Sequence, residues 1–209
     1  MPARDWRYFP VWKSSTNKVL IDLTYVVIPP KPDPRGYLSV PEDKLMIVLN
    51  QHGQEPKMEL KHYIDAPEFH ALAHAVCTSQ RHFLELAAPG RVPTAKELGE
   101  KKSYTWTDYK GREQDGAIIS NRMAVTLATD PERKSPWIIA VEEGPGVKTA
   151  TGAFEPKRGA PTQKVLIYLS TMEMRQMMLM GLEHAQAQTM YRVARQFSPA
   201  NSRPAVSAS

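Results

Sequence analysis

The alternation of apolar and polar residues predicts strands in the first third of the chain. Residues 18–28 (KVLIDLTYVVI) are rich in β-branched and aromatic side chains, and residues 45–49 (LMIVL) form a short apolar run. Both compositions are typical of strands. Residues 57–64 (KMELKHYI) alternate between two faces, as in a strand with one solvated side. The sequence therefore predicts three strands, separated by a proline-rich loop over residues 29–36 and a turn at residues 52–53.

A helix is predicted directly after the third strand. Asp65 and Glu68 have the spacing of a capping box, in which the first side chain accepts a hydrogen bond from a first-turn amide. Pro67 suits the first turn, because the amide that it lacks would have no partner there. The positions that follow at helical spacing are apolar: Phe69, Leu72, Ala73 and Val76. We expect this apolar stripe to pack against a sheet.

A second series of strands begins after residue 102. Alternating or apolar stretches predict strands within residues 103–110, 117–128, 136–142 and 164–169. Residues 143–162 are rich in glycine, proline and basic side chains, so a long flexible loop is expected there. Ser170 and Glu173 form a second capping box, and a long helix is expected over residues 171–197.

The order of these elements occurs twice. Residues 57–76 and 163–185 each contain a basic alternating strand, an N-cap with a glutamate three residues later, and an amphipathic helix. We interpret the chain as an α+β protein with two ββββα-like repeats. The alternative is an ordinary strand–helix pair, which is common in α+β proteins. The predicted organisation is an N-terminal arm (1–17), a first half (18–88), a linker (89–102), a second half with a long C-terminal helix (103–197) and a disordered tail (198–209).

Composition excludes several classes of protein. The 209 residues are 42% hydrophobic and 23% charged, as in an ordinary globular protein. No apolar run is long enough for a transmembrane helix, and the N-terminus lacks the apolar core of a secretory signal. The single cysteine permits no internal disulfide, which favours an intracellular location, in cytoplasm or nucleoid, with an organelle left open. The net charge of +5 favours a polyanionic partner.

Three common enzyme motifs are missing from the sequence. It has no G-x-S-x-G, no P-loop and no dinucleotide-binding glycine fingerprint, so we expect neither catalysis nor a cofactor. His70, His74 and Cys77 share one predicted helix face, and such side chains bind zinc in other proteins. Partly buried helix residues are the favoured interpretation, and a metal-dependent enzyme that uses these three is the alternative.

Residues 18–30 (KVLIDLTYVVIPP), followed by a polar loop and a strand–helix unit, resemble the core of the PC-four-type transcriptional coactivators. The doubled ββββα order is similar to that of the Whirly proteins, which are built from two such units. The resemblance implies curved antiparallel sheets packed with helices, helices at a subunit interface, and single-stranded DNA or RNA bound along the strands.

Single-strand binding requires cations that follow the phosphates and flat side chains that stack on bases. The sequence interleaves both types in several places. The predicted contact residues are Lys101, Lys102, Tyr104, Trp106, Tyr109, Lys110 and Arg112 in the densest cluster, Lys148, Phe154, Lys157 and Arg158 in the glycine-rich loop, and Lys18, Tyr25 and Arg35 in the first half. Packing in the core is the alternative for each aromatic residue.

The long C-terminal helix is apolar on two sides, which suits a helix shared between its own sheet and a partner. We expect a homo-oligomer, a dimer or tetramer, whose interface contains Met174, Met177, Met178, Leu182, Met190, Val193 and Phe197. The sequence thus predicts a protein that binds single-stranded nucleic acid, DNA rather than RNA, with little sequence specificity. The alternative is a protein–protein adaptor or a subunit of a nucleoprotein complex that uses the methionine-rich helix.

Overall fold

The structure, a computed structural model, describes most of the chain between residues 8 and 196. The described residues are 8–28, 42–52, 55, 57–78, 92–95, 105–107, 113–115, 119–128, 130, 132–148, 150 and 154–196.

The first sheet consists of four consecutive antiparallel strands in the order β1-β2-β3-β4. Their bounds are β1 Tyr8–Ser15, β2 Val19–Ile28, β3 Glu42–Gln51 and β4 Met58–Asp65, and helix α1 (Ala66–Thr78) follows at once. Strand β1 pairs with β2 from Tyr8 opposite Val26 to Ser15 opposite Leu20. The segment predicted as an N-terminal arm therefore supplies the first strand of this sheet.

The second sheet repeats this order with insertions. Strands β5 (Val92–Ala95), β8 (Ile119–Leu127), β9 (Trp137–Lys148) and β11 (Gln163–Leu169) are antiparallel neighbours, and helix α3 (Thr171–Gln196) follows. Strands β6 (Thr105–Thr107) and β7 (Glu113–Asp115) pair with each other, and β10 (Phe154–Pro156) pairs with the end of β9. The predicted α+β fold with two ββββα units is confirmed.

Two boundaries differ from the expected ones. The predicted linker contains β5, and the predicted loop over residues 143–162 contains the last part of β9 and all of β10. Proline lacks a backbone donor and is therefore unfavourable inside a long ladder. The ladder between β10 and the end of β9 spans only three residue pairs, so it needs few donors and tolerates Pro156.

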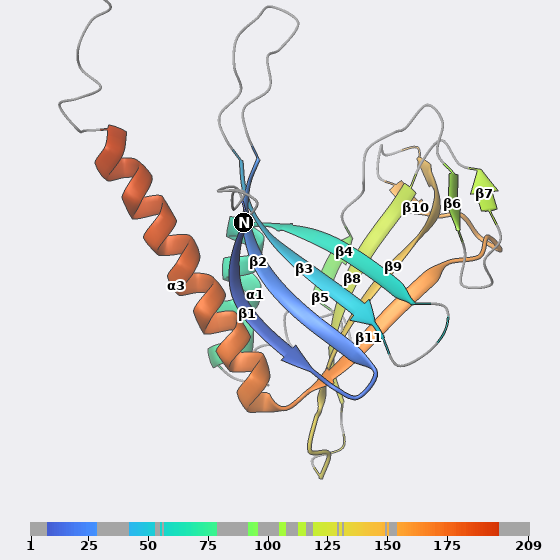
Figure 1. Cartoon of the computed structure of the whole chain (residues 1–209), viewed down its shortest axis with the longest axis horizontal. Helices are drawn as coiled ribbons and strands as arrows, with labels where there is room; N and C mark the ends of the chain where they lie inside the picture. Colours follow the sequence, from blue (N-terminus) through green and yellow to red (C-terminus); the bar gives the residue numbers. More distant parts are fainter. Residues whose placement is uncertain are drawn as a thin grey trace, which may run out of the picture.

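The helices and the two sheets enclose one core (Figure 1). Helices α1 and α3 pack against each other, α3 also contacts β1 and β2, and β11 contacts β2, β3 and β4 of the first sheet. Trp137 of β9 is fully buried in this core. At Gly181 of α3 an added Cβ would lie 2.5 Å from the ring of Phe69 in α1, so the absence of a side chain allows the helices to approach closely.

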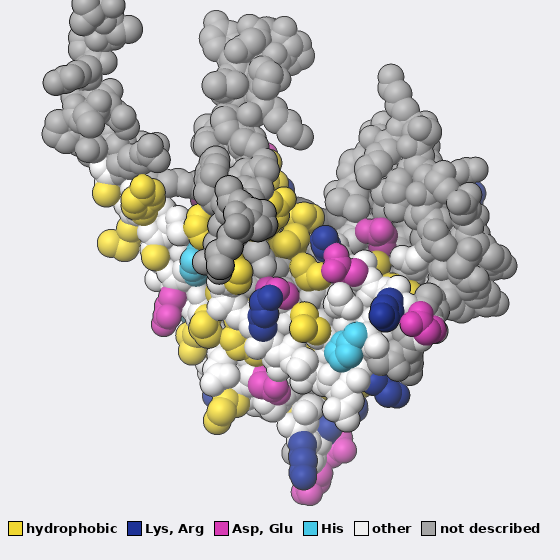
Figure 2. Space-filling view, viewed as in Figure 1, with side chains coloured by type: hydrophobic (Ala, Val, Ile, Leu, Met, Phe, Trp, Pro, Cys, Tyr) yellow, Lys and Arg dark blue, Asp and Glu magenta, His cyan; other side chains and the backbone are white. Residues whose placement is uncertain are grey.

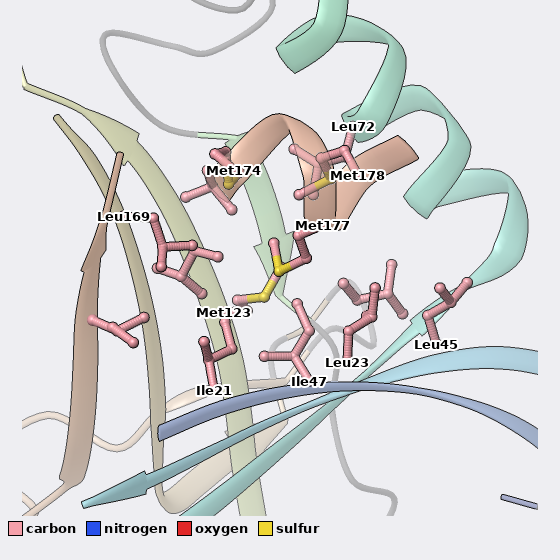
Figure 3. Packing of buried hydrophobic residues seen from close by; sticks show 14 of the residues in the cluster. Ile21, Leu23, Leu45, Ile47, Leu72, Met123, Leu169, Met174, Met177 and Met178 are labelled. Atoms are coloured by element: carbon pink, nitrogen blue, oxygen red, sulfur yellow. The ribbon is translucent and has the colours of Figure 1, made fainter. Parts of the chain in front are cut away.

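Three methionines predicted at a subunit interface belong instead to the core of the protein itself. Met174, Met177 and Met178 have no exposed surface and point toward Leu72, Met123 and residues of the first sheet (Figure 3). That part of the prediction is wrong, because the side of α3 that bears these methionines covers its own sheets. Leu182 also packs against this core, whereas Met190 is 72% exposed. The side chain of Val193 and the whole of Phe197 lie outside the described residues.

The predicted capping box at the start of α3 is present. The Ser170 amide donates to Glu173 Oε2 at 2.8 Å, and the Glu173 amide donates to Ser170 Oγ at 3.2 Å. Ser14 of β1 donates a further hydrogen bond to Glu173 Oε1 at 2.9 Å. The cap therefore fixes the start of the helix to the edge strand of the first sheet.

A buried polar network joins the two sheets. His62 of β4 and Asn121 of β8 are almost completely buried, and His62 Nδ1 lies 2.7 Å from Asn121 Oδ1. The Asn121 amide nitrogen donates to the Lys61 carbonyl at 2.8 Å and to Glu143 Oε2 at 2.9 Å. Because both amide protons are used as donors, Oδ1 is the acceptor and His62 Nδ1 carries the proton.

Candidate nucleic-acid interface

A groove of about 660 Å³ lies where the first sheet meets β11. One wall is the turn between β1 and β2, extended by the end of β3, and the other is β11. The residues that line it are Thr16, Asn17, Lys18, Val19, Gln51, Lys164, Leu166, Ile167 and Tyr168. Polar and charged side chains therefore surround a floor that is partly apolar.

The turn that forms the first wall is held by Thr16. Its hydroxyl accepts from the amides of Lys18 at 3.3 Å and Val19 at 3.1 Å, and its own amide donates to the Val19 carbonyl at 2.8 Å. The His52 amide donates to the Lys18 carbonyl at 2.9 Å, which ties the turn to the end of β3. Asn17 and Lys18 are thus presented to solvent by a backbone with fixed geometry.

Strand β11 forms the second wall through simple alternation. Val165, Ile167 and Leu169 point into the core, whereas Lys164, Leu166 and Tyr168 belong to the opposite face. Tyr168 is 40% exposed, and the guanidinium carbon of Arg133 lies 4.5 Å from the centre of its ring. The strand therefore presents an aromatic ring, and Arg133 from outside the strand places a planar cation beside it.

The electrostatics of the groove favour an anionic ligand. Within the described residues neither Lys18 nor Lys164 forms an ion pair, although Lys13 pairs with Asp22 at 2.7 Å. Glu142 is opposite Lys164 in the β9–β11 register, but its carboxylate bonds to Arg122 at 2.9 Å. The positive charges at the groove are therefore available to a ligand.

Comparisons with known proteins give similarity in fold only. No protein-family model and no curated protein matches the sequence. A similar solved structure is WHY1 from Arabidopsis thaliana, with 10% identity, 95% of this chain and 98% of that chain covered, and a TM-score of 0.44. Another is the plant transcriptional regulator PBF-2, with 11% identity, coverages of 92% and 89%, and a TM-score of 0.47. Both are Whirly proteins, the kind that the sequence resembles. At these identities and TM-scores neither likeness indicates what this chain binds.

The structure places only part of the predicted contact set. Lys18 lines the groove, and Lys157 and Arg158 are exposed in the turn that precedes β11. Trp106 lies in β6, Lys148 ends β9 and Phe154 begins β10, but the side chains of these three lie outside the description. The other members of the predicted set that fall outside the described residues are Lys101, Lys102, Tyr104, Tyr109, Lys110, Arg112 and Arg35.

Tyr25 requires a correction. It was predicted to contact nucleic acid, but it has no exposed surface. Its ring packs 5.3 Å from that of His184 and 6.3 Å from that of Phe9, measured between ring centres. Because α3 covers this part of β2, the ring belongs to the core and offers no face to a base.

Three residues at or beside the groove were not predicted from the sequence: Lys164 and Tyr168, which line it, and Arg133, which packs on the Tyr168 ring. The alternation of Lys164, Leu166 and Tyr168 within KVLIYL was the available signal, because it separates a solvated face from a buried one. Arg133 carried no such signal, since it comes from the connection between β8 and β9 and meets Tyr168 only in the fold.

The possible zinc ligands do not form a site. His70 and His74 are exposed, Cys77 is half-buried, and burial raises the pKa of the Cys77 thiol, which disfavours the thiolate that binds metal. Among the described residues there is no group of three or more histidine, cysteine or acidic side chains suited to a metal ion. Neither helix of the described chain is long and apolar enough to cross a membrane.

Proposed function

We propose that this protein binds single-stranded nucleic acid in the groove between the β1–β2 turn and β11. The observation that supports the proposal is the meeting of Lys18 and Lys164, which have no ion pair among the described residues, with the partly exposed ring of Tyr168. Lysine ammonium groups bind backbone phosphates, and a tyrosine ring stacks on an exposed base.

The groove favours a single strand over a duplex for two reasons. Stacking on Tyr168 requires a base whose face is free, whereas in a duplex the neighbouring base pairs cover the faces of each base. The volume of about 660 Å³ lies within the range of roughly 300–1,000 Å³ typical of small-ligand sites, so it holds a short, thin segment of a chain. Because a tyrosine ring stacks on any base, weak sequence dependence is expected.

Additional cations support the same ligand. Lys157 and Arg158 are exposed in the turn that leads into β11, and both belong to the set predicted from the sequence. The Lys157 amide donates to the Pro145 carbonyl at 2.9 Å, which holds this turn against β9. We expect these two side chains to add phosphate contacts to those of the groove. DNA rather than RNA remains the favoured ligand.

The test is fluorescence anisotropy with labelled single-stranded DNA, single-stranded RNA and duplex DNA. Tyr168→Ala should weaken single-strand binding by about 1–3 kcal/mol, the range for loss of one stacking platform. Tyr168→Phe keeps the ring and should stay close to wild type. Absence of wild-type binding at micromolar protein, or equal binding by Tyr168→Ala and Tyr168→Phe, would contradict the proposal.

The outer face of α3 favours a second candidate function, as a subunit that assembles with another copy of itself. Met172, Leu179, Met180, Met190 and Tyr191 are exposed, and hydrophobic side chains gather along this helix (Figure 2). A face of this kind often marks an interaction site. The interface predicted from the sequence would then use Met190 and these neighbours, while the core keeps the three buried methionines.

Charge on the same face suits an antiparallel pairing of two α3 helices. Arg175, Leu179 and Glu183 are exposed at successive i, i+4 positions. When two copies pair antiparallel about Leu179, Arg175 of each meets Glu183 of the other. Sedimentation should show an oligomer that Met190→Glu or Leu179→Glu weakens, and a monomeric wild type would exclude this candidate.

A further inference from the structure

The two ends of the groove wall on β11 differ in chemistry and lie a defined distance apart. Tyr168 and Lys164 belong to the same face of the strand, four residues apart. Because a strand rises about 3.3 Å per residue, their Cα atoms are roughly 13 Å apart. A ligand that uses both therefore needs an aromatic group at one end and negative charge at the other.

A nucleoside triphosphate has this form. Its base is at one end of the extended molecule and its terminal phosphates are at the other, whereas a monophosphate carries its charge next to the sugar. We infer that a free nucleoside triphosphate binds in this groove, with its base on Tyr168 and its phosphates at Lys164 and Lys18, and competes with the nucleic-acid strand. The inference rests on the proposed function, because both ligands use the same groove.

Other features of the groove fit this ligand. Its volume of about 660 Å³ is that of a cofactor-sized site, roughly 300–1,000 Å³. The side-chain amides of Asn17 and Gln51, which also line the groove, can donate to and accept from a base or a sugar hydroxyl. The guanidinium of Arg133 against the Tyr168 ring adds a planar cation on which a base can stack.

The experiment is competition against a labelled single-stranded oligonucleotide, with adenosine, AMP, ATP, GTP and inorganic tripolyphosphate as competitors. ATP and GTP should displace the oligonucleotide at concentrations about 5- to 150-fold lower than tripolyphosphate, the ratio that one stacked base contributes. Tyr168→Ala should remove this advantage over tripolyphosphate. Lys13→Ala changes a lysine that pairs with Asp22 outside the groove, so it should behave as wild type.

The outcomes separate the two proposals. Suppose that the oligonucleotide binds the protein in the absence of competitor, and that ATP and tripolyphosphate displace it at equal concentrations. This result would overturn the inference and leave the proposed function intact. If the oligonucleotide does not bind, isothermal titration calorimetry measures directly whether ATP binds the protein. Binding of ATP that Tyr168→Ala weakens would then support a nucleotide site without strand binding, and no heat of binding would overturn both proposals.

Discussion

Replacement of Asn121 by leucine removes the polar contact between the two sheets while keeping a side chain of similar size. Asn121 accepts from His62 Nδ1 and donates to the Lys61 carbonyl and to Glu143, at distances between 2.7 and 2.9 Å. Leucine can make none of these bonds. The walls of the groove come from different sheets, so this contact also helps to position the candidate site.

The expected loss of stability follows from the groups that lose their partner. Glu143 is only half-buried and can turn to water, and the Lys61 carbonyl loses a bond that is only partly buried, but the His62 ring loses a partner at a buried position. A buried polar group that loses a partner costs about 1–3 kcal/mol, so we expect Asn121→Leu to lower the free energy of unfolding by about 1–3 kcal/mol. That is a measurable part of the roughly 5–15 kcal/mol of a typical domain.

Urea unfolding followed by tryptophan fluorescence measures this change. The buried Trp137 is one reporter of the packed core. The control is Asn50→Leu, because the bond of 3.4 Å from the Asn50 side chain to Glu59 is exposed, and the effect of this substitution should stay within about 0.5 kcal/mol. An Asn121→Leu effect as small as that of the control would refute the role given to the network.

Three further stability predictions concern α3. Gly181→Ala should cost about 1–3 kcal/mol in urea unfolding, because the new methyl group meets the Phe69 ring and the helices must separate. Hydrogen bonds, first from Ser170, lower the pKa of Glu173 below its ordinary 4.5. The ionised Glu173 carboxylate therefore stabilises the fold fully above pH 4.5, and this stabilisation is lost as the pH falls through the lowered pKa of the folded state. The difference in unfolding free energy between wild type and Glu173→Gln should narrow over that pH range. Burial lowers the pKa of His184 below its ordinary 6.5, so below pH 6.5 the unfolded chain binds a proton that the folded protein does not. In thermal melts below pH 6.5, wild type should therefore lose stability relative to His184→Leu. A difference in melting temperature that does not change with pH would contradict this prediction.

The strands with clear patterns could be predicted from the sequence, and β1 shows why one was not. Strands β2, β3, β4 and β11 combine buried positions with β-branched residues, which is the signal that period and composition detect. The β1 segment YFPVWKSS contains Pro10 and only half-buried or exposed side chains. A sheet edge tolerates proline because one side of the strand needs no ladder, and the register shifts between Pro10 and Trp12.

The errors at the candidate site have a common physical cause: an apolar or aromatic residue does not reveal which neighbour covers it. Tyr25 lies in a stretch of β2 that is buried on both faces, so its ring is enclosed although Lys18 directly precedes the strand. The two apolar sides of α3 look alike in sequence, yet one covers the sheets and the other is exposed. Lys18 and Lys164 are far apart in the chain, and only the packing of β11 against the first sheet brings them to one groove.

The salt dependence of single-strand binding tests the central proposal most directly. Each lysine that contacts a phosphate contributes about 0.7 to the slope of log affinity against log salt concentration. The double variant Lys18→Ala/Lys164→Ala should therefore have a slope shallower than wild type by about 1.4, whereas Lys13→Ala keeps the wild-type slope. A double variant with the wild-type slope and affinity would contradict the account, because the strand would then bind elsewhere on the protein.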